Sequence, residues 1–219
     1  MDDLASNEAV PEPVAEYCAY LVSRLPGALG DCLVGVCLYG SPTIGGFDPA
    51  TSDVDVLIVV SGHLGVSIKS ALIRLLWETA PRVPARSLEC WVITTETAGA
   101  GGSMRDFEVM VNTHPSEPMT VDGATGAVGV PVVELDLVNE TGWSFYGPSP
   151  SDLVAAIPRS AVLASMAENL RVETADSSEH YSVLNASRSL AYMFTGKHIS
   201  KLEGGRWVLA RGSAPKVVE

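Results

Sequence analysis

Basic residues are scarce in this sequence. Fourteen Lys and Arg stand against 26 Asp and Glu among 219 residues, and the formal charge at pH 7 is −12. A nucleic-acid-binding protein needs a basic surface that neutralises phosphates, so this composition argues against DNA or RNA as a partner. An acidic surface attracts cations instead, and the balance suits a cationic small molecule.

Long hydrophobic runs are also lacking. Apolar segments such as residues 54–60 have the length of a strand, whereas a membrane span needs about 20 residues. The start, Met1-Asp2-Asp3-Leu4, is acidic where a secretory signal has a basic region. We therefore expect a cytoplasmic protein with no membrane partner.

The sequence also has no cysteine pairs with the spacing of a metal site. The four cysteines form no CxxC motif and have no histidine close by in the sequence, which argues against a zinc site. Three of them lie in apolar segments, where we expect them to be buried as small hydrophobic side chains. Apolar residues make up 47% of the chain, which is enough for a packed core.

The apolar pattern predicts an α/β part followed by a helical part. Short apolar runs predict buried strands over residues 32–39, 54–60 and 88–94. A half-exposed strand is expected over 107–111, a loop over 120–130, and helices over 13–25, 68–79, 132–140, 153–170, 178–194 and 200–210. The turn-rich residues 146–150 separate the two parts, which predicts domains over 1–148 and 149–219.

The chemistry is concentrated where two of these strands begin and end. Gly40-Ser41 ends the first strand, and Asp53-Val54-Asp55 opens the second after a loop of eleven residues. Aspartates at i and i+2 on a strand point to one face, and such carboxylates suit Mg²⁺ ions that bridge nucleotide phosphates. Gly-Ser offers backbone N–H groups and a hydroxyl to a phosphate. Two solvated acids at a strand entrance remain the simpler alternative.

This pattern resembles the polymerase-β-like nucleotidyltransferase superfamily, which uses a third carboxylate on a neighbouring strand. Glu89 is an acid inside an apolar strand, where burial is costly unless the group faces a site. Glu108 is the rival, but it alternates with apolar residues as a solvated position would. We therefore assign the third carboxylate to Glu89.

Longer stretches resemble the aminoglycoside 3''/9-adenylyltransferases. They are residues 38–41 (LYGS), 45–49 (GGFDP), 52–57 (SDVDVL), Gly147-Pro148, Ser187-Arg188, Thr195-Gly196-Lys197, Lys201 and Trp207. The resemblance implies an α+β fold: a polymerase-β-like nucleotidyltransferase domain, with a mixed sheet flanked by helices, followed by a small, shortened α-helical domain. It also implies transfer of AMP from ATP, in the presence of Mg²⁺, to a hydroxyl of an aminoglycoside or aminocyclitol antibiotic.

The resemblance assigns roles to individual residues. Asp53, Asp55 and Glu89 would bind Mg²⁺, and Glu89 would also act as general base on the acceptor hydroxyl. The residues that would contact ATP are Gly40, Ser41, Ser52, Arg188, Lys197 and Lys201.

Acceptor recognition is expected from Glu173, Asp176 and Glu179, which could bind ammonium groups or form an ordinary polar linker. Residues 169–174 lack the Trp of streptomycin-modifying members, and Ser178 stands where the family has an aspartate. These departures favour a spectinomycin-like acceptor over streptomycin. Two alternatives remain: a nucleotidyltransferase with another acceptor, such as a protein or another small molecule, and a nucleotide-binding module that has lost its chemistry. A monomer and a homodimer are both compatible with the sequence.

Overall fold

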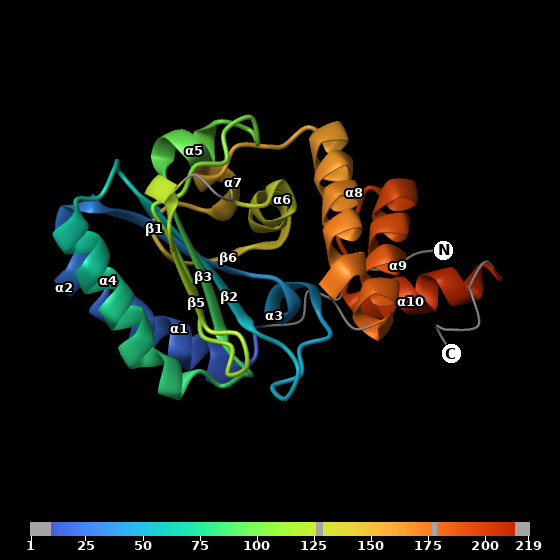
Figure 1. Ribbon diagram of the computed structural model, residues 1–219, viewed down its shortest axis with the longest axis horizontal. Coiled ribbons are helices and arrows are strands. Elements are labelled where there is room, and N and C mark those ends of the chain that lie inside the picture. Colours follow the sequence, from blue (N-terminus) through green and yellow to red (C-terminus); the bar gives the residue numbers. More distant parts are fainter. Residues whose placement is uncertain (1–9, 126–128, 177–178, 213–219) are drawn as a thin grey trace.

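The computed structural model describes residues 10–125, 129–176 and 179–212 (Figure 1). Its centre is a six-stranded mixed sheet in the order β5-β4-β3-β2-β1-β6. β2 and β3 run parallel, and every other neighbouring pair is antiparallel. The strands are β1 Leu33–Tyr39, β2 Val54–Val60, β3 Leu88–Thr94, β4 Val109–Asn112, β5 Met119–Asp122 and β6 Trp143–Tyr146.

Helices cover both faces of this sheet, which explains why its central strands are almost continuously apolar. On one face lie α1 Glu12–Arg24, α2 Pro26–Leu29 and α4 Val66–Thr79 (Figure 1). On the other face lie α5 Thr95–Gly99, α6 Val132–Thr141 and α7 Pro150–Leu153. Cys18, Cys37 and Cys90 are buried in this core as expected, and all four cysteines are free. Shorter elements are α3 Ser41–Ile44, η1 Gly30–Cys32, η2 Ala80–Arg82 and η3 Gly123–Thr125.

Three further helices pack at one end of the molecule: α8 Arg159–Asp176, α9 Glu179–Thr195 and α10 Lys201–Ala210 (Figure 1). α8 contacts α6, and α9 contacts both α8 and α10. The mixed sheet flanked by helices and followed by a helical part confirms the predicted fold class. The division between residues 148 and 149 stays a prediction, and the structure adds that α7 packs against α5 and α6. No helix within the described ranges has the length and apolar character needed to cross a bilayer.

Several element boundaries differ from the sequence prediction. The helix expected over 153–170 is replaced by the short α7 and by α8, which begins at Arg159. Pro158 explains the gap, because proline disfavours a helical conformation at the residue before it. β5 occupies part of an expected loop, and β6 was not expected. Both are short edge strands, and pairing with β4 and β1 forms them despite weak local patterns.

The interpretation of Glu108 as a solvated residue is wrong. Glu108 is 4% exposed, and its carboxylate accepts hydrogen bonds from the Leu64 N–H and from His63 Nδ1, which lies 2.7 Å away. Lys69 Nζ from α4 lies 3.2 Å from the same carboxylate and 2.8 Å from Asp122 Oδ1. The expected half-exposed strand is buried as well, because helices cover both faces of the sheet. Glu108 thus joins α4 to the sheet and stands apart from the candidate site.

Candidate active site

Two of the predicted carboxylates, Asp55 and Glu89, lie side by side on neighbouring strands of the sheet and form what we call the carboxylate row. Tyr39 on β1 pairs with Asp55 on β2, Asp55 pairs with Glu89 on β3, and Glu89 pairs with Asn112 on β4. Residues paired across neighbouring strands point to the same face of a sheet. Two acids that are 34 positions apart in the sequence are therefore neighbours.

Gly40 lies directly beside Asp55. Its φ of +75° favours glycine, and a Cβ atom built at this position would collide with Asp55 Oδ2. Ser41 follows as the first residue of α3. The Gly-Ser pair is thus at the edge of the carboxylate row, and phosphate binding by it stays a prediction.

The two aspartates of the Asp-x-Asp motif have different surroundings. Asp53 accepts hydrogen bonds from Arg86, with Nη2 2.8 Å and Nε 3.2 Å from its oxygens, and a further one from the Ser87 hydroxyl. The carboxylate of Asp55 makes no hydrogen bond or ion pair within the part of the chain that the structure describes. Burial, reinforced by the charges of Glu89 and Glu134, raises the pKa of Asp55 well above its usual range.

Glu89 is held by two donors. Trp91 Nε1 lies 3.0 Å from Oε1 of Glu89, and Asn112 Nδ2 lies 3.3 Å from Oε2. Burial raises the pKa of Glu89, and the hydrogen bond from Trp91 opposes this shift. A carboxylate that is fixed in orientation and has a raised pKa is well suited to act as a general base.

Sequence reasoning missed a fourth acid, Glu134, in the first turn of α6. Burial and the nearby Glu89 raise its pKa to about 7. The hydroxyl of Tyr39 is buried and has no hydrogen-bond partner among the described residues. Burial raises the pKa of this hydroxyl, and the charges of Glu134, Asp55 and Glu89 add to the rise. Glu134 could have been found by the signal that identified Glu89, an acid between apolar residues.

These carboxylates fit a divalent cation. Mg²⁺ prefers oxygen ligands, and Asp55 offers a buried carboxylate without a donor while neighbouring acids oppose its ionisation. A bound cation would remove that repulsion. The residues that would hold it are Asp55, Glu89 and, after release from Arg86, Asp53.

Positive charges approach the row from the C-terminal helices. Burial raises the pKa of Glu134, but Arg188 on α9 and Lys201 at the start of α10 oppose the shift. Burial likewise raises the pKa of Asp55 and of Glu89, and Lys201 opposes part of each rise. Its ammonium lies 3.9 Å from the centroid of the Tyr181 ring. The candidate site thus combines acids from the sheet and α6 with cations from the C-terminal helices.

The structure does not place the remaining predicted site residues beside the carboxylate row. Ser52 Oγ accepts a hydrogen bond from the Asp48 N–H at 3.1 Å and so closes the loop before β2. Lys197 is exposed in the segment after α9. The side chains of Glu173, Asp176 and Glu179 lie outside the described residues, although their positions fall at the end of α8 and the start of α9. Their roles stay predictions.

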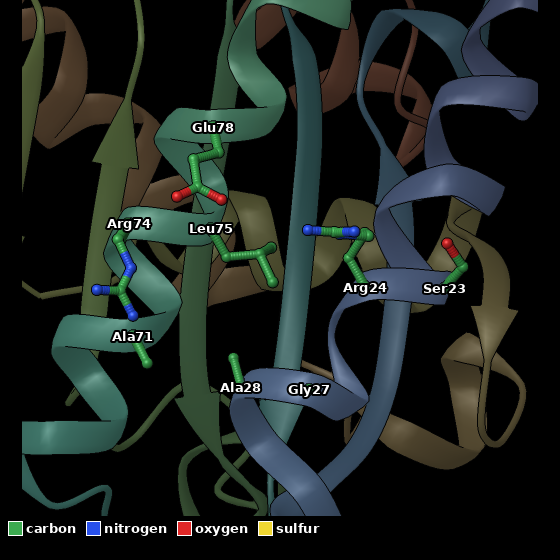
Figure 2. Close-up of a pocket in the computed structure, with 8 residues that line it drawn as sticks. All are labelled: Ser23, Arg24, Gly27, Ala28, Ala71, Arg74, Leu75 and Glu78. Atoms are coloured by element: carbon green, nitrogen blue, oxygen red, sulfur yellow. The ribbon is translucent and has the colours of Figure 1, made fainter.

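A surface groove of about 360 Å³ lies between the α1–α2 segment and α4. Figure 2 shows Arg24, Arg74 and Glu78 among the residues that line it. These helices cover the sheet face opposite α6, so the groove is separate from the carboxylate row.

Comparisons with known proteins support the fold. A crystal structure of spectinomycin adenyltransferase AAD(9) from Enterococcus faecialis, with ATP and spectinomycin, matches with a TM-score of 0.69 at 20% identity. The match covers 90% of this chain and 82% of that one. A toxin-antitoxin structure with AMP-PNP matches at 12% identity over 71% of this chain and 90% of that one, with a TM-score of 0.34 that carries no argument. No curated protein sequence matches the chain.

The C-terminal helices also match a protein family. Residues 152–215 match the family described as "Aminoglycoside adenylyltransferase, C-terminal domain", an enzyme family of the nucleotidyltransferase class. These findings confirm the resemblance predicted from the sequence: the chain has a fold similar to that of the AAD(9) structure, and residues 152–215 match the C-terminal domain of the aminoglycoside adenylyltransferases.

Proposed function

We propose that the protein transfers AMP from ATP to a hydroxyl group of a cationic aminocyclitol antibiotic and releases pyrophosphate, which would confer antibiotic resistance. One observation carries this proposal: Asp55 and Glu89 are paired on adjacent strands and face the charges of Lys201 and Arg188. Acids that suit a metal-bound nucleotide and cations that suit its phosphates thus lie close enough to influence one another's pKa values.

The reaction is a displacement at the α-phosphorus of ATP. The acceptor oxygen forms a bond to this phosphorus, the bond to the bridging oxygen breaks, and pyrophosphate leaves with the electron pair. Glu89 takes the proton of the attacking hydroxyl, and Trp91 and Asn112 hold its carboxylate in place. Bound Mg²⁺ would neutralise phosphate charge and orient the triphosphate.

Phosphate binding on the helical side is assigned to Arg188 and Lys201, whose charges reach the carboxylate row. Gly40 and Ser41 lie at its edge, where backbone N–H groups suit a phosphate. Ser52 and Lys197 are proposed for the same function from the sequence alone.

The acceptor is proposed to be spectinomycin-like. Two observations support this choice: residues 169–174 lack the Trp of streptomycin-modifying members, and the matching AAD(9) structure contains spectinomycin. The acids Glu173, Asp176 and Glu179 are proposed to bind the ammonium groups of the acceptor.

Mass spectrometry of reactions with MgATP and a panel of aminoglycosides tests this function. We expect an antibiotic to gain one AMP unit, and Glu89→Gln to slow its formation by about 10²–10⁴-fold, the range for general-base catalysis. Omission of Mg²⁺ should abolish the product. Binding of MgATP without any adenylylated drug would indicate another acceptor. Absence of MgATP binding would overturn the proposal and favour a module that has lost its chemistry.

A further inference from the structure

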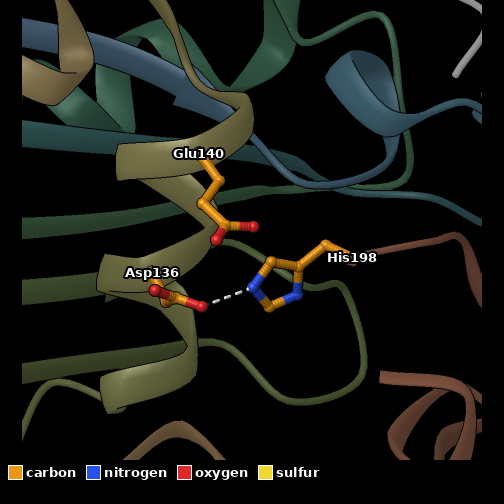
Figure 3. A group of neighbouring side chains, drawn as sticks. All are labelled: Asp136, Glu140 and His198. Atoms are coloured by element: carbon orange, nitrogen blue, oxygen red, sulfur yellow. Dashed lines mark hydrogen bonds and ion pairs between the residues drawn. The ribbon is translucent and has the colours of Figure 1, made fainter. Parts of the chain in front are cut away.

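A buried polar cluster joins α6 to the segment between α9 and α10. Asp136 on α6 is 3% exposed, and its Oδ2 accepts a hydrogen bond from the Tyr192 hydroxyl of α9 at 3.1 Å. His198 Nε2 lies 2.7 Å from the same oxygen (Figure 3). The rings of Tyr192 and His198 are 4.6 Å apart at their centroids. A buried carboxylate is costly unless it is hydrogen-bonded, so the two donors bind both C-terminal elements to α6.

The position of this cluster in the chain connects it to the site. His198 precedes Lys201 by three residues. Between them, Ser200 caps α10 through reciprocal hydrogen bonds with Glu203. Ser200 also packs against Gly46, where an added Cβ atom would lie 3.0 Å from that of Ser200. The start of α10 is therefore fixed by α6 on one side and by the loop after Gly40-Ser41 on the other.

α9 and α10 pack closely against each other at Gly204. A Cβ atom at Gly204 would lie 2.6 Å from the Cα of Arg188. Only glycine permits this close approach of the two helices, and it brings Arg188 and the first turn of α10 together. Whatever fixes α10 therefore fixes both cations that face the carboxylates.

We propose that Asp136, His198 and Tyr192 are positioning residues that dock Lys201 and Arg188 against the catalytic row and thereby set the affinity for the triphosphate. This inference rests on the proposed function, because it assigns those cations to phosphate. α6 contributes to both the acids and the placement of the cations. Glu134 lies beside the carboxylate row, and Asp136, two residues later, holds His198 in the segment that leads to Lys201.

A metal site is the competing reading of this cluster. One ligand atom from each of Asp136, Glu140 and His198 lies within 4.8 Å of the others. However, Oδ2 of Asp136 already has two donors, and Glu140 is exposed. If a metal ion were held here, Glu140 would matter as much as His198. In the docking arrangement Glu140 has no part.

Calorimetry of MgATP binding to the full chain tests the proposal without an acceptor. We expect His198→Ala to weaken binding about 10-fold, which corresponds to the loss of one hydrogen bond to a charged group. His198→Gln, whose amide can donate to Asp136, should recover most of that loss. Glu140→Gln is the matched control and should bind as the wild type does. Thermal melting of each variant establishes that it is folded.

A double-mutant cycle tests whether His198 affects MgATP binding through Lys201. Because His198 acts through Lys201, His198→Ala in a Lys201→Ala background should change affinity by less than about 2-fold. Additive losses, unchanged affinity in His198→Ala, or an equal loss in Glu140→Gln would each overturn the proposal. If His198→Ala does not fold, Tyr192→Phe, which removes one donor, takes its place with an expected loss of about 3-fold. Absence of MgATP binding by the wild type would instead refute the proposed function itself.

Discussion

The acidic side and the cationic side of the candidate site are held in place differently. The acids lie on adjacent strands, where the hydrogen-bond ladder fixes Asp55 beside Glu89. The cations lie on helices whose placement depends on a few contacts, chiefly Gly204 against Arg188 and Asp136 with His198. The acid side is electrostatically unfavourable without a ligand, because burial raises its pKa values. The cation side depends on those few contacts, so changes to them should affect nucleotide affinity more than chemistry.

Removal of an acid should have the largest effect. Asp55→Asn is expected to lower kcat by about 10³-fold, because metal-assisted charge stabilisation contributes several kcal/mol to the transition state. The melting temperature of the ligand-free protein should rise, since a buried charge without a donor is removed. Turnover assays and melting curves measure both effects. A loss of activity below about 10-fold would show that the row does not carry the chemistry.

A change that pushes α9 and α10 apart should have the next largest effect. Gly204→Ala places a Cβ atom against the backbone of Arg188, and such overpacking destabilises by about 1–3 kcal/mol. MgATP binding should weaken about 10-fold, because both cations are displaced together. Gly62→Ala is the matched control, since a Cβ atom there has open space around it. Equal ATP affinity in the two variants would contradict the coupling of Arg188 to α10.

The pH dependence of stability should identify Glu134 as part of the acid side. Its pKa of about 7 lies above the usual value of 4.5, so between these values the native state binds more protons than the unfolded state. By linkage, the free energy of unfolding must then fall as pH rises through this window. Glu134→Gln should flatten the fall without abolishing it, because Asp55 and Glu89 contribute in the same direction. Denaturant titrations from pH 5 to pH 8 test this expectation.

Glu78→Gln, on the opposite face of the sheet, is the control for that series. It should retain the wild-type slope of unfolding free energy against pH. Mg²⁺ should stabilise the wild type more at pH 8 than at pH 5, because ionised carboxylates bind it. An equal effect of Mg²⁺ at both values would mean that the row does not hold the ion.

The smallest effect is expected from Lys197→Ala. Lys197 is exposed after the end of α9, and an exposed charge without fixed geometry contributes little, about 0–1 kcal/mol. MgATP affinity should therefore change by less than about 5-fold. Calorimetry beside Lys201→Ala provides the comparison. A loss equal to that of Lys201→Ala would place Lys197 among the phosphate ligands.

The sequence predicted the strands that carry Asp55 and Glu89, but it did not predict which side chains of other elements lie beside them. The apolar strands, Gly40-Ser41 and the Asp-x-Asp motif predicted the row because strand periodicity is a local property. The same reasoning failed for Glu108, since alternation with apolar residues does not reveal the helix α4 that buries it. Glu134 also lies between apolar residues, as Glu89 does, but the sequence does not show which strands its helix will cover.

By itself, the sequence determined the chemistry available to this protein: which acids lie on strands, where glycine permits close approach, and which family the C-terminal helices match. Only the tertiary structure decided how those groups meet. It paired Asp53 with Arg86, brought Glu134 to Asp55, and anchored His198 to Asp136. The physical reason is that strand faces follow from local geometry, whereas contacts between distant elements depend on how those elements pack.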